Sequence, residues 1–200
     1  MFEAMFEFGW NPILENENII GLNKGGKNIT LEPGNQIELS GEKLNHLHEA
    51  CAESQDYLFE LRQVTQKLDI NIVSAGFDPI SKLDEIPNNP KQRYKLMTKD
   101  MPLGGELSLD MMYRTCGTQL NLDYKSEDDF IKKFKIVNSI VPISIALFAN
   151  SAIVEKKKSN YLSYRSKVWQ STSRGGLPKI FFEKLDFEKY AEFVINFPIL

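Results

Sequence analysis

Two glutamates, Glu32 and Glu38, stand on either side of a Pro-Gly-Asn sequence within residues 29–41. Apolar and polar residues alternate on both sides of this turn, the pattern of two strands joined as a hairpin. In such a hairpin both carboxylates project from the polar face, where they suit a hard cation such as Mg²⁺ that arrives with substrate phosphates. Acids on hairpins also commonly face water, so the pattern alone leaves both interpretations open.

A second polar row lies in residues 115–124, which alternate in the manner of a strand. Gln119, Asn121 and Asp123 share one face of it. Amides both donate and accept hydrogen bonds, and they can therefore orient a small polar ligand. The competing interpretation is a polar strand face that meets solvent.

The cations that could bind an anionic substrate are Arg93, Arg165 and the lysine run at residues 156–158. A guanidinium is suited to bidentate capture of a carboxylate, although either arginine could equally form a surface ion pair. The lysine run is typical of a solvated loop, and a lid over nucleotide phosphates is the alternative.

Composition places the chain among ordinary globular proteins. It has 200 residues, 42% hydrophobic and 11% aromatic, and a net charge of −3 without a clustered basic surface, so no nucleic-acid partner is expected. Cys51 and Cys116 match no zinc or disulfide framework and are interpreted as buried thiols of a reducing compartment. The start of the chain lacks the pattern of a signal peptide, and residues 140–149 are too short to span a bilayer. A soluble cytoplasmic protein without a membrane partner is expected.

The elements that must position these residues form an α+β pattern. The helix from residue 42 is expected to cover the back of the sheet, and the apolar residues 143–148 are expected to be buried. Gly25 and Gly26 indicate a hairpin turn rather than a phosphate-binding loop. Ser126 is the expected N-cap of the longest helix. Helices are predicted over 42–68, 91–101, 107–113, 127–148 and 187–196, and strands over 19–22, 28–32, 36–39, 70–77, 115–124 and 177–182.

Seven motifs in the same order resemble those of glutamate–cysteine ligases of the plant and alphaproteobacterial type. Together they extend over nearly the whole chain, which makes the resemblance far more specific than any one of them. They are Leu31–Gly41 (LEPGNQIELSG), Leu47–Glu53 (LHEACAE), Lys91–Tyr94 (KQRY), Leu109–Cys116 (LDMMYRTC), Gln119–Asp123 (QLNLD), Ala146–Ser151 (ALFANS) and Tyr161–Ser166 (YLSYRS).

This resemblance implies an ATP-dependent enzyme that joins the amine of cysteine to the γ-carboxylate of glutamate, the first step of glutathione synthesis. It implies a γ-glutamyl phosphate intermediate, with ATP and Mg²⁺ required. The implied fold is α+β and similar to glutamine synthetase, with a curved antiparallel sheet lining a cleft and helices packed behind it.

By the same resemblance, particular residues acquire roles. Glu32 and Glu38 look like the family's glutamates that bind Mg²⁺ or Mg-ATP. Gln119 and Asn121 are expected to face the same cleft. Arg93 and Arg165 look like the arginines that hold the carboxylates of glutamate.

The sequence departs from the family pattern in three places. A strand with closely spaced glutamates precedes the hairpin in family members, and further sheet and cleft residues follow position 200. The segment 170–177 is also shorter than in relatives. Residues 1–200 are therefore expected to be part of a catalytic domain that lacks both ends, and to be incomplete as an enzyme alone.

Two other functions remain open from the sequence. One is an ATP-dependent carboxylate–amine ligase that uses another amine, because the motifs define the acceptor side least. The other is a non-catalytic binding or folding fragment of such an enzyme.

Overall fold

The computed structural model describes residues 1–172, 180 and 183–196, which form two units. The first unit comprises Met1–Ser74 with Asp84–Leu96, and the second comprises Ala75–Leu83 with Met97–Leu200. Apart from residue 180, the predicted strand 177–182 lies outside the described residues.

The first unit contains an antiparallel sheet in the strand order β1-β2-β3-β4. Its strands are β1 (Asn11–Glu15), β2 (Asn18–Lys24), β3 (Lys27–Leu31) and β4 (Ile37–Ser40). Lys24 pairs with Lys27 across Gly25-Gly26, and Gly25 has a φ of 62°, which confirms the predicted hairpin turn. Asn35 reaches a φ of 62° in the turn between β3 and β4, a conformation that asparagine tolerates.

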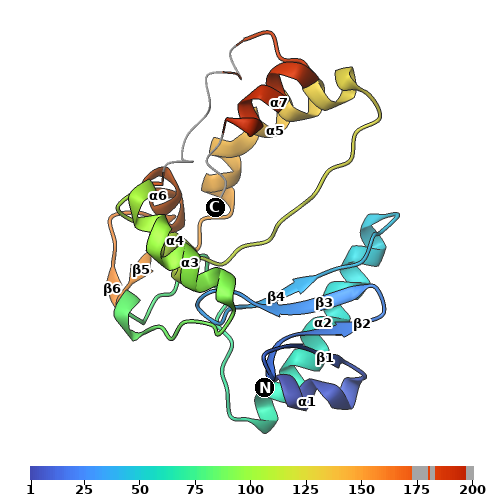
Figure 1. The fold of residues 1–200 in the computed structure, drawn as a ribbon, viewed down its shortest axis with the longest axis vertical. Helices are drawn as coiled ribbons and strands as arrows, with labels where there is room; N and C mark the ends of the chain where they lie inside the picture. Colours follow the sequence, from blue (N-terminus) through green and yellow to red (C-terminus); the bar gives the residue numbers. More distant parts are fainter. Residues whose placement is uncertain (173–179, 181–182, 197–200) are drawn as a thin grey trace. The chain divides into compact units, whose positions relative to one another are not determined.

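The core of this unit lies between one sheet face and two helices, α1 (Phe2–Met5) and α2 (Leu47–Lys67) (Figure 1). α2 covers one face of the sheet, as predicted, and the burial of apolar side chains is the main force that holds it there. The buried side chains are Phe2, Met5, Trp10, Leu22, Ile29 and Val64. α2 begins later than residue 42, because His46 is its N-cap and accepts a hydrogen bond from the N–H of Glu49.

The helix α3 (Gln92–Asp100) confirms the prediction for residues 91–101, and the boundary between the units falls within it. The loop before it contains the short 3₁₀ turn Leu83–Glu85. In the first unit this loop is fixed to the β3–β4 turn. Asn35 Nδ2 donates to the carbonyl of Pro87 at 3.0 Å, and the N–H of Asn89 donates to the carbonyl of Pro33 at 3.0 Å.

The second unit is mainly helical. α4 (Ser108–Arg114) packs on α6 (Tyr164–Gln170) and on the 3₁₀ turn Met101–Gly104, and β5 (Ile153–Val154) pairs with β6 (Lys157–Lys158). The two-residue loop of that hairpin, Glu155-Lys156, has φ values of 49° and 66°.

α5 (Glu127–Leu147) and α7 (Phe187–Ile195) lie side by side (Figure 1). Aromatic rings from the two helices pack against one another. Phe130 and Tyr190 have ring centroids 5.0 Å apart, and Phe134 and Tyr190 are 5.4 Å apart. Ser126 caps α5 as predicted, because its Oγ accepts from the N–H of Asp129 at 3.2 Å.

Several predictions about these elements are wrong. Residues 70–77 and 115–124 are irregular, and the only pairing described there is a single bridge between Phe77 and Thr115. The apolar end of α5 and both cysteine residues are exposed rather than buried. Among the helices described, none is long and apolar enough to cross a membrane.

Candidate functional site

The two candidate metal ligands lie on the polar face of the β3–β4 hairpin. Glu38 pairs with Thr30 across the ladder, and Thr30 Oγ1 donates to Glu32 Oε1 at 3.0 Å. The apolar residues of the same strands pack against the core on the opposite face. The hairpin therefore gathers both carboxylates on the side that the alternation predicted.

The charges of this pair influence each other. Burial and the nearby negative charge of Glu32 raise the pKa of Glu38, while Lys91 opposes the shift. A bound cation would relieve this repulsion. Within the described ranges, no group of three or more His, Cys, Asp or Glu side chains could hold a metal ion. Two carboxylates nevertheless fit Mg²⁺, which commonly takes one or two of them together with waters and substrate phosphates.

Two residues of the Lys91–Tyr94 motif contact the same hairpin, and the sequence did not single them out. Lys91 Nζ donates to the carbonyl of Leu31 at 2.7 Å, and the hydroxyl of Tyr94 lies 3.1 Å from Glu32 Oε2. The motif places Lys91 directly before α3 and Tyr94 in the first turn of that helix, and both side chains reach the hairpin. Arg93, which the sequence did single out, is exposed on the same helix.

Arg165 lies in the first turn of α6 in the second unit, where burial lowers the pKa of its guanidinium. Its backbone N–H donates to the buried Ser151 Oγ at 3.1 Å, and its Nε is buried without a hydrogen-bond partner in the part of the chain that the structure describes. Among the described residues, neither Arg93 nor Arg165 forms an ion pair. The structural ion pair, which was the alternative role for each arginine, is therefore not found among the described residues.

Glycines make room for the Arg165 side chain. A Cβ added at Gly117 would lie 3.0 Å from Arg165 Nη2, and one added at Gly76 would lie 3.3 Å from its Cδ. The backbone at both positions therefore approaches the arginine more closely than a side chain would comfortably allow.

Gln119 and Asn121 follow Gly117, whose backbone lies beside Arg165, but they are not on a strand. Both are exposed, and Gln119 Nε2 donates to Asn121 Oδ1 at 3.0 Å. The structure thus brings these two amides together on an irregular segment of the second unit. The acidic pair and Arg93 belong to the first unit, so the six candidate residues form two separately described groups.

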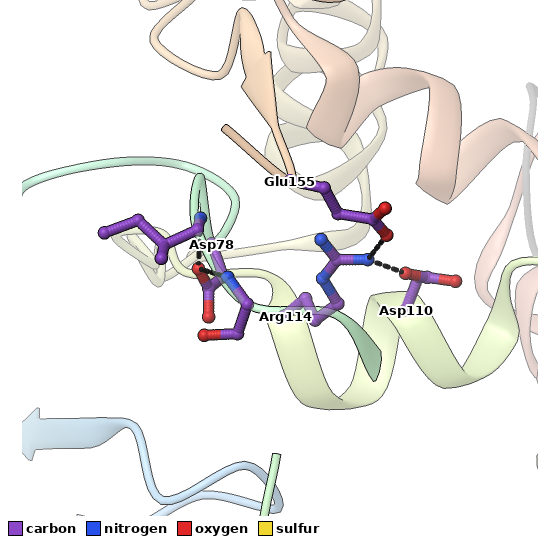
Figure 2. Close-up of polar contacts among 6 residues, drawn as sticks. Asp78, Asp110, Arg114 and Glu155 are labelled. Carbon is purple, nitrogen blue, oxygen red and sulfur yellow. Dashed lines mark hydrogen bonds and ion pairs between the residues drawn. The ribbon is translucent and has the colours of Figure 1, made fainter. Parts of the chain in front are cut away.

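A buried arginine that the sequence analysis missed, Arg114, organises the second unit. Only 3% of its side chain is exposed, and its Nη1 donates to Asp110 at 2.9 Å and to Glu155 at 3.4 Å (Figure 2). Its guanidinium also lies 4.4 Å from the centre of the Phe77 ring. The spacing of Asp110 and Arg114, four residues apart on a helix, is the signal that could have found this pair.

Asp78 shapes the loop beside Arg114. Its Oδ1 accepts from the N–H groups of Ile80 at 2.8 Å and Ser81 at 3.0 Å (Figure 2). Burial raises the pKa of Asp78, but these hydrogen bonds and the charge of Arg114 outweigh it and hold the pKa below its ordinary value. The N–H of Lys156 donates to the carbonyl of Pro79 at 2.8 Å, which attaches the β5–β6 turn to the same loop.

Comparisons with known proteins agree with the motifs. The model of glutamate-cysteine ligase family 2 matches residues 11–200. The chain is 44% identical over 195 residues to a chloroplastic glutamate–cysteine ligase of Nicotiana tabacum, covering 96% of this chain and 37% of that protein. It is 43% identical to the chloroplastic enzyme of Medicago truncatula and to chloroplastic glutamate–cysteine ligase A of Oryza sativa subsp. japonica. These matches also cover 96% of this chain, and 38% and 40% of those proteins.

Two consequences follow from these likenesses. The chain spans about two-fifths of the length of the relatives it matches, at 37–40%. The prediction of a cytoplasmic protein is wrong on this comparison, because the matched plant relatives are named as chloroplastic enzymes.

Proposed function

Because the chain belongs to glutamate-cysteine ligase family 2, we propose that the protein joins L-cysteine to the γ-carboxylate of L-glutamate at the expense of ATP. The observation that carries this proposal is the match over residues 11–200, a range that includes all six candidate site residues. Residues 1–200 then form part of a catalytic domain of α+β architecture. We further propose that this domain resembles glutamine synthetase, with its curved sheet lining the cleft.

The reaction needs an activated carboxyl group, because a carboxylate is a poor electrophile. Transfer of the γ-phosphoryl group of ATP to the glutamate γ-carboxylate gives an acyl phosphate and ADP. The amine of cysteine then attacks the acyl carbon, and phosphate leaves as the amide bond forms. Mg²⁺, when bound, offsets the repulsion between the carboxylate and the triphosphate.

Glu32 and Glu38 are the proposed ligands of Mg²⁺, and their position on one hairpin face supports this role. Glu38 is carried by β4, and Glu32 directly follows β3 and is held by hydrogen bonds from Thr30 and Tyr94, so the pair can hold the metal and its nucleotide in one place. Glu38→Gln in the intact enzyme should therefore raise the Mg²⁺ concentration needed for activity. An unchanged Mg²⁺ response would remove Glu38 from the metal site.

Arg165 and Arg93 are the proposed anchors of the glutamate carboxylates. The Nε of Arg165 supports this role: it is buried and has no hydrogen-bond partner among the described residues, so an incoming carboxylate can supply one. Gln119 and Asn121 are proposed to face the same substrate. As neutral hydrogen-bonding groups they can orient polar atoms without adding charge.

The proposal is tested by the identity of the amine acceptor. ADP release from the intact protein is measured with ATP, Mg²⁺ and glutamate, while each amino acid is supplied in turn. Stimulation by cysteine is expected. Stimulation by a different amine and not by cysteine would contradict the proposal and favour another carboxylate–amine ligase.

A further inference from the structure

The phenol of Tyr94 reaches the carboxylate of Glu32 from α3. Only 5% of Tyr94 is exposed, and its hydroxyl lies 3.1 Å from Glu32 Oε2 and 3.3 Å from the carbonyl oxygen of Leu31. A phenol has one proton to donate, so these two acceptors compete for it.

Lys91 decides this competition in favour of the carboxylate. Its ammonium already donates to the carbonyl of Leu31 at 2.7 Å, the shorter of the two bonds at that oxygen. The positive charge of Lys91 disfavours a hydrogen bond from the Tyr94 hydroxyl to the same carbonyl oxygen. The ionised carboxylate of Glu32 is also the stronger acceptor. The phenol proton therefore points to Glu32.

Both oxygens of Glu32 are then held by hydroxyl groups. Thr30 donates to Oε1 at 3.0 Å, and Tyr94 donates to Oε2. A carboxylate oxygen can accept two hydrogen bonds, so each oxygen keeps one lone pair available for a cation. Thr30 also pairs with Glu38 across the strands, which places the held carboxylate beside the second acid.

We propose that Tyr94 is a positioning residue, which orients the Glu32 carboxylate toward Mg²⁺ with Thr30 holding the other oxygen. This inference rests on the proposed metal role of Glu32. Partners that fix a ligand in this way typically affect metal affinity by about 10–100-fold, because a free carboxylate would lose its rotational freedom on binding.

The test replaces Tyr94 by Phe in the intact protein. Phe keeps the buried ring that lies 5.2 Å from the Lys91 ammonium, and it removes only the hydroxyl. Two quantities are measured: the Mg²⁺ concentration for half-maximal ADP release at saturating ATP, glutamate and cysteine, and the affinity for the Mn²⁺ complex of a non-hydrolysable ATP analogue by water-proton relaxation. Both should weaken by about tenfold, while the maximal rate at saturating Mg²⁺ changes little.

Tyr57→Phe is the matched control, because Tyr57 is a half-buried tyrosine that packs against the core of the same unit, and no hydrogen bond to either acid is described for it. It should leave both metal readouts unchanged. Thr30→Val is the second variant, and it should shift both readouts in the same direction as Tyr94→Phe. If Tyr94→Phe does not fold, Thr30→Val decides the test alone.

Glu32→Gln separates the inference from the proposed function. If Glu32→Gln weakens metal binding and neither Tyr94→Phe nor Thr30→Val does, the positioning role is overturned and the metal role stands. If Glu32→Gln leaves metal binding unchanged, the metal role fails and the inference fails with it.

Discussion

Replacement of the buried Arg114 by Met should destabilise the second unit strongly, and more than replacement of its exposed partner Glu155 by Gln. The side chain of Asp110 is 15% exposed and would lose its nearest cationic partner, whereas Glu155 is 43% exposed and would be taken over by water. Removal of one partner from a buried ion pair costs about 3–5 kcal/mol. Because both acids retain some access to water, we expect the lower end, about 3 kcal/mol. Met preserves the apolar stem and the helix propensity of the site.

Glu155→Gln provides the contrast. Its ion pair with Arg114 is longer, at 3.4 Å, and it lies at an exposed hairpin turn, so its loss should cost less than about 1 kcal/mol. Adding Asp110→Asn to Arg114→Met should recover part of the lost stability, since the less exposed of the two acidic partners then carries no charge.

The assay follows tryptophan fluorescence during thermal unfolding. The sequence has two tryptophans, Trp10 in the first unit and Trp169 in the second, so a Trp10→Phe background reports the second unit alone. Arg114→Met should lower its midpoint by about 6–12 °C, at about 2–4 °C per kcal/mol for a protein of this size. Equal shifts for Arg114→Met and Glu155→Gln, or no recovery with Asp110→Asn, would contradict a stabilising role of the buried Arg114–Asp110 ion pair.

Three further predictions concern other residues of the second unit. Arg165→Lys should raise the glutamate KM of the intact enzyme about tenfold, because lysine lacks the bidentate fork, and an effect no larger than that of the exposed control Arg62→Lys would count against the role. Gly117→Ala places a Cβ 3.0 Å from Arg165 Nη2, so it should raise the same KM with little change in the thermal midpoint; a lowered midpoint with an unchanged KM would indicate a structural role only. Asp78 has a lowered pKa, so its carboxylate stabilises the fold above the ordinary aspartate pKa of about 3.9, and this contribution is lost as the pH falls through the folded pKa. The free energy of unfolding of Asp78→Asn should thus be below that of the wild type at pH 7, and a difference that persists unchanged in acid would argue against this linkage.

Elements whose partners are close in the sequence were predictable. The β3–β4 hairpin follows from its alternation and turn, and α5 follows from its Ser126 cap and apolar stripe. The predicted strands do not include β1, which contains Pro12. Proline is tolerated on an edge strand, and β1 is the edge of its sheet.

Features that depend on distant partners were not predictable. Residues 70–77 and 115–124 have strand-like composition, but a strand also needs a neighbour, and the described residues supply a single bridge. The hydroxyl contact of Tyr94 with Glu32 joins residues 62 positions apart. A sequence pattern can nominate Glu32 as a ligand, but it does not reveal which side chain holds it.

The most direct test of the proposed reaction is the fate of the γ-carboxylate oxygens. The intact enzyme is supplied with glutamate labelled with ¹⁸O in the γ-carboxylate, together with ATP, Mg²⁺ and cysteine, and the released phosphate is analysed by mass spectrometry. One ¹⁸O atom is expected in each phosphate, because that oxygen bridges to phosphorus in the acyl phosphate and leaves with it. Unlabelled phosphate, released while the amide product forms, would contradict activation of the γ-carboxylate by ATP.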